Sequence, residues 1–221
     1  FKKLILMCNL YSQKSSLDEI KDWFDVEIIK PSAGNLPAQS AIFPAYNAPV
    51  VSLRNGRRSI SMMKWGFVLN RRDKAIKHVN NCRDDKLLTS QFWRAAFFSR
   101  RCLVPVTRFS EYHPSRLNEN GHKACVWFEL NDMKIFSFAG IWTNFTGYYK
   151  DQVSSFSTYS IVTTTPNDLV KQIHPSRMPV IIEPSSYETW LNGSNEMAID
   201  LLKTYSENKM RIAYVGKNLD E

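Results

Sequence analysis

The stretch APVVSLRNGRRSISMMKWGFV, residues 48–68, decides the fold class. Two runs with strand-like composition flank Asn55-Gly56, a dipeptide that accepts the positive φ angles of a tight hairpin turn. A hairpin of two antiparallel strands is therefore predicted here, and the rest of the chain is interpreted around it.

Further elements follow on both sides of this hairpin. The segment SSLDEIKDWFDV (15–26) carries the capping box Ser16 and Glu19 before apolar residues at helical spacing, which predicts an amphipathic helix. Other helices are predicted at residues 88–101, 185–193 and 194–206, and strands at 102–109, 123–130, 134–142, 157–165 and 211–216. Short strands with scattered helices predict an α+β fold: a single domain with a mainly antiparallel, barrel-like β-sheet core and several peripheral helices.

Composition and charge limit the possible functions. The 221 residues are 43% apolar, enough for one substantial core, and the formal charge is +8 with a pI near 9.3. Residues 54–108 hold fourteen Lys and Arg against three Asp, a net +11 that exceeds the charge of the whole chain. A cationic surface suits a polyanion such as DNA, although many proteins that bind none are basic. No apolar run approaches the roughly 18 residues of a membrane helix, so no membrane partner is expected.

The four cysteines give no sign of a metal site. Cys8, Cys82, Cys102 and Cys125 form no C-x-x-C pair and no Cys/His spacing of the zinc type. We expect no metal and no cofactor, a reducing bacterial or phage-related cytoplasmic location, and buried thiols at Cys82, Cys102 and Cys125.

Four polar stretches stand out from their apolar surroundings. They are MCNLYS (7–12), VNNCRDD (79–85), RRCLVPVTRFSEYHP (100–114) and TTTPNDLVKQIHPSRMPVII (163–182). Their order and approximate spacing resemble the signature of the SOS response-associated peptidase (SRAP) family, which includes a eukaryotic 5-hydroxymethylcytosine-binding protein. The resemblance covers nearly the whole chain. It implies that residues 7–221 are a SRAP domain and that residues 1–6 are a leader, an expression remnant or a miscalled start.

The same resemblance implies a reaction and a set of residues. Removal of Met7 would leave Cys8 at the N-terminus, where it reacts with the aldehyde of an abasic site in single-stranded DNA and forms a stable covalent crosslink. Asn81, Glu111 and His174 would complete the catalytic site. The DNA-binding residues implied in this way are Arg83 and Arg177 for phosphates, Trp65 and Gly66 near the bases, and Thr164 and Met178.

Elementary chemistry agrees with a terminal cysteine. An α-amine titrates near 7.7–8.0 and a lysine near 10.4, so far more of the amine is unprotonated at neutral pH. Once it has condensed with an aldehyde, the neighbouring thiol closes a five-membered thiazolidine. A carboxyl such as Glu111 in a partly apolar setting is suited to proton transfer, as is His174 near neutrality, while Asn81 both donates and accepts hydrogen bonds.

Each residue also has a structural interpretation. Cys8 could be a buried thiol, Glu111 a solvent-facing strand residue, His174 a loop histidine and Asn81 a turn former. Trp65 is the candidate for stacking on a base, and Thr163, Thr164 and Thr165 offer hydroxyls or simply pack in a strand. Two alternative functions remain: a thiol-dependent peptidase that acts on its own leader, and a non-covalent binder of single-stranded or modified DNA. The protein is expected to be a monomer.

Overall fold

The computed structural model describes residues 9–69 and 76–216 of the chain. Its strands are β1 (Leu10–Gln13), β2 (Ile28–Ile29), β3 (Gln39–Ile42), β4 (Asn47–Arg54), β5 (Arg57–Trp65), β6 (Phe67–Leu69), β7 (Lys77–Val79), β8 (Asn81–Arg83), β9 (Arg101–Val106), β10 (Arg108–Leu117), β11 (Lys123–Leu130), β12 (Phe136–Tyr149), β13 (Gln152–Thr164), β14 (Met178–Pro179), β15 (Ile181–Ile182) and β16 (Met210–Gly216). The helices are α1 (Leu17–Trp23), α2 (Gln91–Ser99), α3 (Asp168–Lys171), α4 (Tyr187–Asn192) and α5 (Asn195–Asp200), and 3₁₀ turns lie at η1 (Pro31–Ala33), η2 (Asp84–Lys86), η3 (Pro184–Ser186) and η4 (Glu207–Lys209).

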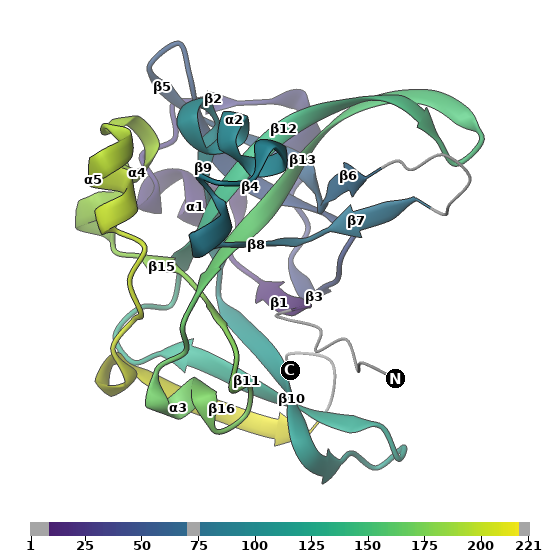
Figure 1. The fold of residues 1–221 in the computed structure, drawn as a ribbon, viewed down its shortest axis with the longest axis vertical. Coiled ribbons are helices and arrows are strands. Elements are labelled where there is room, and N and C mark those ends of the chain that lie inside the picture. Colours follow the sequence, from purple (N-terminus) through teal and green to yellow (C-terminus); the bar gives the residue numbers. More distant parts are fainter. Residues whose placement is uncertain (1–8, 70–75, 217–221) are drawn as a thin grey trace.

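Five strands close into a barrel. Strands β5, β4, β9, β12 and β13 are neighbours in that order, and each of these pairs is antiparallel. The ring is completed by parallel pairing of β13 with β5, through Thr158 opposite Lys64 and Tyr159 opposite Trp65. The predicted α+β class with a mainly antiparallel, barrel-like sheet is confirmed (Figure 1).

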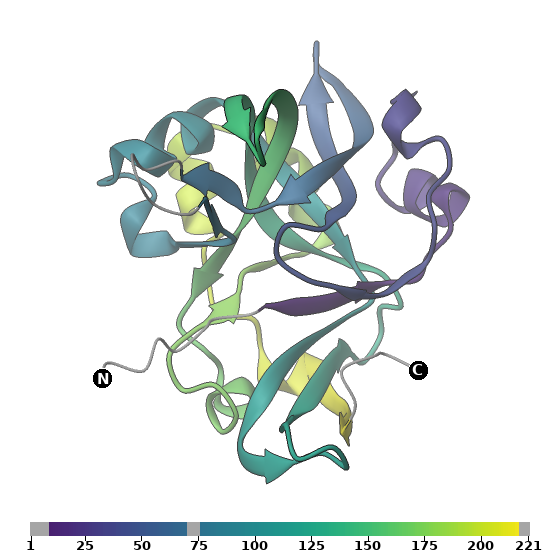
Figure 2. The ribbon, with the colours of Figure 1, turned by 90° about the vertical axis from the view of Figure 1, so that its right-hand side faces the viewer.

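A second, antiparallel sheet packs against the barrel, with the strand order β16-β11-β10-β1-β3. It lies below the barrel in Figure 2, and the apolar core between the two includes Tyr11, Phe109 and Ile161. The hydroxyls of Tyr11 and Tyr159 lie 2.5 Å apart and link the two sheets across this core. Because side chains alternate along a strand, every second residue of β10 faces the barrel.

Helices α1, α2, α4 and α5 cover the outer face of the barrel (Figure 1), where Ile20, Trp93 and Trp190 belong to a second core. Arg101 is buried in this layer and donates to the carbonyl oxygens of Trp190, Phe97 and Gly193. One residue of the basic segment is thus structural, since its guanidinium satisfies backbone oxygens at the ends of two helices. Within the described ranges, no helix is long and apolar enough to cross a membrane.

The predicted local signals appear where they were expected. Asn55 and Gly56 adopt φ angles of 52° and 74° in the β4–β5 turn, and both hydrogen bonds of the Ser16–Glu19 capping box are present. The helix predicted over 194–206 is shorter, since α5 ends at Asp200. Beyond it the chain turns toward β13, where the Thr204 hydroxyl donates to the carbonyl of Thr165 at 2.9 Å.

Candidate functional site

Strand register brings Glu111 to the beginning of the described chain. In the β1–β10 pair, Leu10 lies opposite Ser110 and Tyr11 opposite Phe109, so Asn9 continues toward Glu111. Glu111 is only 3% exposed. It lies two residues after Phe109 and therefore on the same face of the sheet, toward the barrel. The solvent-facing interpretation of Glu111 is thereby ruled out.

The loop before β8 holds Asn9 from the barrel side. The side-chain amide of Asn80 donates to Asn9 Oδ1 at 2.7 Å. The main-chain carbonyl of Asn80 accepts from Trp65 Nε1 at 2.9 Å and from the Ile161 amide at 3.0 Å. Asn80 is thereby fixed to two strands of the barrel while it binds the segment that follows Cys8.

Asn81 faces the same space from the barrel. It is 7% exposed and pairs in parallel with Ile161, whose side chain belongs to the core between the two sheets. The pairing places Asn81 on the inner face, the side from which Asn80 reaches Asn9. Asn81 on the barrel and Glu111 on the second sheet therefore both face the space between the two sheets. Cys8 itself lies outside the described residues.

His174 follows α3 and is held in one orientation by its own loop. The side chain is 6% exposed, and its Nδ1 lies 2.9 Å from the Arg177 carbonyl oxygen and 3.3 Å from the Arg177 amide. The shorter contact has Nδ1–H donating to the carbonyl, which leaves Nε2 as a nitrogen that accepts a proton. Nε2 is buried and has no hydrogen-bond partner among the described residues. Burial lowers the pKa of His174, so the ring is neutral at pH 7.

Arg177 ties the His174 loop to β8. Its guanidinium bonds Asp84 Oδ1 at 2.6 Å and also donates to the carbonyl of Thr163, with a side chain only 10% exposed. The resemblance assigns Arg177 to DNA phosphates. In this structure the guanidinium instead bridges the two segments that carry Asn81 and His174, which makes it a positioning residue for both.

The second predicted phosphate ligand, Arg83, is accessible. Its side chain is 51% exposed and forms a two-pronged ion pair with Asp85 at 2.9 and 2.8 Å. The partner raises the pKa of Arg83 and lowers that of Asp85. A phosphate would have to compete with this carboxylate for the guanidinium.

The expectation that Trp65 stacks on a base is wrong for this structure. Its side chain is fully buried in the barrel, where it stacks on Tyr159 with ring centroids 6.4 Å apart and meets Tyr11 edge-on at 5.1 Å. The alternation along β5 turns Trp65 inward, so it supports the loop of Asn80 and offers no surface to DNA.

Gly66 follows Trp65 and permits a close approach. It adopts φ +110°, and a Cβ atom added there would lie 2.7 Å from the Cβ of His78 on β7. Its carbonyl also contacts His78 Nδ1 at 3.3 Å. Only glycine fits at this position, whatever its role toward DNA.

Gly66→Ala is therefore expected to destabilise the protein by roughly 2–3 kcal/mol, because it combines an unfavourable φ angle with a clash against the Cβ of His78. The measurement is urea unfolding monitored by circular dichroism. Gly121→Ala is the matched control: Gly121 has φ +75° but open space around its Cβ position, so about 1 kcal/mol is expected. Equal losses in the two variants would show that the contact with His78 contributes nothing.

The remaining predicted DNA contacts are buried side chains. Thr164 is 4% exposed and pairs with Met178, which is fully buried and accepts a hydrogen bond from the Asn167 amide through its sulfur. A role for either residue toward DNA stays a prediction. Cys82, Cys102 and Cys125 are buried as predicted, and desolvation raises the pKa of each thiol. Within the described residues, no group of three His, Cys, Asp or Glu side chains could hold a metal.

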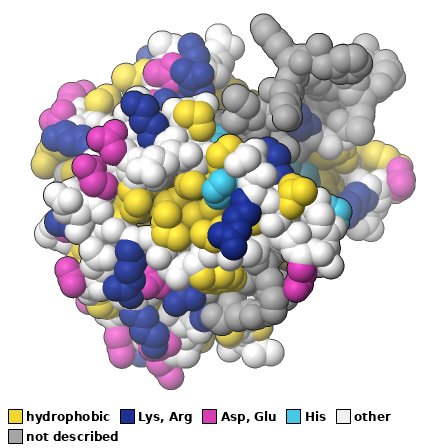
Figure 3. Space-filling view, turned by 90° about the horizontal axis from the view of Figure 1, so that it is seen from below, with side chains coloured by type: hydrophobic (Ala, Val, Ile, Leu, Met, Phe, Trp, Pro, Cys, Tyr) yellow, Lys and Arg dark blue, Asp and Glu magenta, His cyan; other side chains and the backbone are white. Residues whose placement is uncertain are grey.

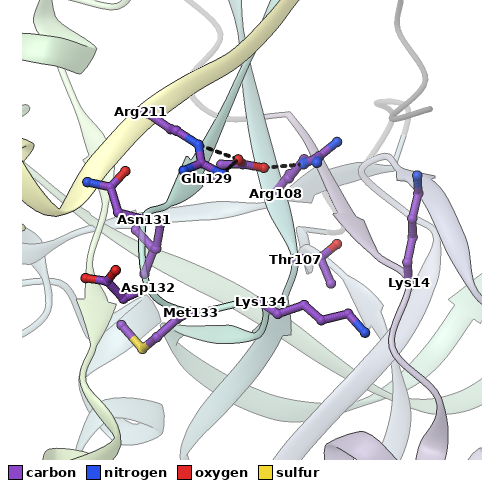
Figure 4. A pocket seen from close by; sticks show the side chains of 10 residues that line it. Lys14, Thr107, Arg108, Glu129, Asn131, Asp132, Met133, Lys134 and Arg211 are labelled. Atoms are coloured by element: carbon purple, nitrogen blue, oxygen red, sulfur yellow. Dashed lines mark hydrogen bonds and ion pairs between the residues drawn. The ribbon is translucent and has the colours of Figure 1, made fainter.

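A cavity of 540 Å³ near the other end of the five-stranded sheet contains none of the predicted site residues (Figure 4). Glu129 accepts from Arg108 Nε at 2.7 Å and from Arg211 Nε at 2.6 Å, as the dashed lines in the figure mark. Lys134, also in its lining, pairs with Glu19 at 2.8 Å. Several cations here are occupied by carboxylates, which weakens the attraction for an external anion.

A model of the family described as SOS response associated peptidase (SRAP) matches residues 7–221. The chain belongs to the SRAP family. It is 28% identical over 194 residues to abasic site processing protein YoaM of Bacillus subtilis, covering 86% of this chain and 81% of that protein. Abasic site processing protein YoqW, from Bacillus subtilis and from Bacillus phage SPbeta, is 26% identical over 215 residues, covering 95% of this chain and 92% of that protein.

Solved structures share the SRAP fold at lower identity. A protein from Bacteroides thetaiotaomicron superimposes with a TM-score of 0.77 at 23% identity, over 96% of this chain and 93% of that chain. A protein from Bordetella bronchiseptica gives 0.75 at 19% identity, over 92% and 97%. The arrangement of barrel and second sheet is thus common to both proteins.

Sequence reasoning missed two residues of this candidate site: Asn9, and Asn80, which bonds Asn9 to the barrel. Both are next to residues that were predicted, Cys8 and Asn81, but no sequence signal shows that two distant asparagines meet. Viewed from the side of the second sheet, hydrophobic side chains gather on the middle of the surface, with Lys and Arg and some Asp and Glu side chains around them (Figure 3). Such a surface can hold both the bases and the phosphates of a strand.

Proposed function

We propose that this SRAP protein captures abasic sites in single-stranded DNA by forming a covalent thiazolidine with an N-terminal Cys8. The observation that carries the proposal is the hydrogen bond from Asn80 to Asn9 together with the register of β1 against β10, because the two place the residue after Cys8 between the barrel and the strand that carries Glu111. The names of the relatives YoaM and YoqW support the substrate class.

The reaction balances without a cofactor. The α-amine of Cys8 adds to C1′ of the ring-opened deoxyribose, and the resulting carbinolamine loses water to give an iminium ion. The thiol Sγ then adds to C1′, and its proton is released to a base. One water leaves in total and nothing is oxidised or reduced.

The surrounding side chains divide the proton transfers. Glu111, buried on the inner face of β10, opens the closed sugar by moving a proton between its oxygens. His174 Nε2 takes a proton when the amine or thiol adds, and Asn81 orients the amine or a sugar oxygen. Arg177 holds the segments of Asn81 and His174 together through Asp84.

The test is incubation of protein confirmed to begin at Cys8 with a single-stranded oligonucleotide that contains one abasic site. We expect an adduct that survives denaturation, one DNA per monomeric chain, and none with the intact oligonucleotide. DNA binding that falls with salt but gives no adduct would favour the non-covalent alternative.

The family is described as a peptidase, which favours a second candidate activity: Cys8 itself removes the residues that precede it. Mass spectrometry of the full chain separates the two. Loss of residues 1–7 that depends on time and on Cys8 would indicate self-processing, whereas a constant mass would indicate that another enzyme exposes the cysteine.

The pH dependence of adduct formation tests His174. The rate is expected to fall as the α-amine becomes protonated below about pH 8, and to fall more steeply once Nε2 is protonated. Burial lowers the pKa of His174, so this second loss occurs below its ordinary value of about 6.5. The profile is measured by quenching the reaction at timed intervals between roughly pH 5 and pH 9, a range that covers the pKa values of both groups, and quantifying the adduct.

In His174→Gln the steeper acidic part is expected to disappear, together with a lower rate at neutral pH. His122→Gln, a change in an exposed loop, should retain the wild-type profile. A His174→Gln profile with the same shape as the wild type would exclude Nε2 as the proton acceptor.

A further inference from the structure

A second cavity opens at the mouth of the barrel, away from the candidate site. Strands β5 and β13 are paired at Lys64–Thr158 and Trp65–Tyr159, whereas the earlier part of β5, at Ser59 and Ile60, pairs with β2 instead. A cavity of 470 Å³ occupies this opening. Trp65 and Tyr159 stack inside the barrel and separate the cavity from Asn80.

Five serine hydroxyls line the cavity, and two of them have hydrogen-bond partners: Ser157, and Ser32, which accepts from the Met62 amide at 3.2 Å. Ser52, Ser59 and Ser61 make no side-chain hydrogen bond with any described residue. Ser157 donates to Asn144 Oδ1 at 2.8 Å, which leaves the NH₂ group of Asn144 as a donor. The lining therefore offers several donors and acceptors that a polar ligand could satisfy.

The charge of the lining has a single sign. Arg54 is exposed and Lys30 is half-buried, neither forms an ion pair with a described residue, and no Asp or Glu lines the cavity. This distinguishes it from the cavity around Glu129, where carboxylates already occupy the arginines. A guanidinium and an ammonium that line one cavity without a carboxylate favour a phosphate group there.

A half-buried indole completes the site. Trp142 of β12 lines the cavity, and its backbone is fixed by hydrogen bonds to Arg100 on both sides, Trp142 N to Arg100 O at 2.9 Å and Arg100 Nε to Trp142 O at 3.2 Å. These bonds fix the strand at Trp142; its ring packs partly against the core and borders the cavity, where it can serve as a stacking surface for a planar base. The volume lies in the usual range of small-molecule pockets, about 300–1,000 Å³.

From this combination we infer that the mouth of the barrel binds a mononucleotide. The base would stack on Trp142, serine hydroxyls and Asn144 would bond the sugar, and Arg54 with Lys30 would bind the 5′-phosphate. The inference does not depend on the proposed crosslinking reaction, because none of these residues belongs to the site of Asn81, Glu111 and His174.

Titration of ¹⁵N-labelled full chain with AMP and with ribose 5-phosphate, followed by NMR, tests the inference. We expect saturable shifts of the Trp142 indole and Asn144 amide with AMP, and weaker binding of ribose 5-phosphate, which lacks the base. Arg54→Gln should weaken AMP binding about tenfold or more, the loss expected for one charged hydrogen bond.

Arg57→Gln is the matched control, because Arg57 lies opposite Arg54 in the same hairpin but pairs with Glu27 and does not line the cavity. It should leave AMP affinity within about twofold of the wild type. Three results would overturn the inference: no saturable binding up to about 10 mM AMP, equal binding of ribose 5-phosphate, or a larger loss of affinity in Arg83→Gln than in Arg54→Gln. The last result would place the nucleotide in the DNA site.

Discussion

Cys8→Ala is expected to abolish the covalent adduct with abasic single-stranded DNA completely. The substitution keeps the α-amine but removes the thiol, so the iminium ion cannot close to a thiazolidine and hydrolyses again. The assay is a denaturing gel of protein that begins at residue 8, with a labelled oligonucleotide carrying one abasic site. Equilibrium binding of the same DNA should change little, because the phosphate contacts remain.

Two controls separate the thiol from the amine. Cys102→Ala removes a buried thiol inside the barrel and should form the adduct normally once folded. A chain that retains residues 1–7 keeps the Cys8 thiol but has its amine in a peptide bond, and it should form no thiazolidine. An adduct of unchanged yield from Cys8→Ala would mean that another nucleophile attacks the sugar.

Glu111→Gln is expected to slow adduct formation by about 10²–10⁴-fold, the usual contribution of a positioned general acid or base. The amide has nearly the same shape as the carboxyl, so the packing of β10 against β11 and the affinity for DNA should be retained. Single-turnover quenching at saturating DNA measures the effect on the chemical step alone.

Glu129→Gln provides the matched comparison, since Glu129 is a mostly buried carboxylate on the adjacent strand. Its partners are Arg108 and Arg211, and it lies outside the candidate site. We expect lower stability and an unchanged rate per folded molecule. Equal rate losses in the two variants would indicate that both act through the packing of the sheet, and Glu111 would not be the proton-transfer group.

Local signals predicted much of the fold. Asn55-Gly56 and the Ser16–Glu19 capping box depend on neighbouring residues only, so the sequence shows them directly. The closure of the barrel by β13 against β5 pairs residues almost a hundred positions apart, and no local pattern specifies it. The length of the β12–β13 hairpin was also missed, because its turn uses Lys150 and Asp151 at φ 47° and 65°, where glycine or asparagine is usual.

The site was predicted from the order of motifs, and the structure supplies what that order cannot. Glu111 and Asn81 are buried, and their catalytic roles stay predictions; Trp65 is also buried, which the motif could not show because a strand residue can face either side. Arg177 was expected at phosphates and is instead paired with Asp84. The carboxylate that pairs with Arg177 lies 93 residues away in the sequence, so no local pattern shows that this cation is occupied.

The order in which the chain is synthesised gives the pairing of β1 with β10 a further consequence. Strand β10, which carries Glu111, is made roughly a hundred residues after β1, or about 5–20 s later at ordinary translation rates. During this interval β1 lacks one of its two neighbours, so the second sheet cannot be complete until residues 108–117 have been synthesised. The face of β1 that carries Tyr11 therefore joins the core between the two sheets only late in synthesis.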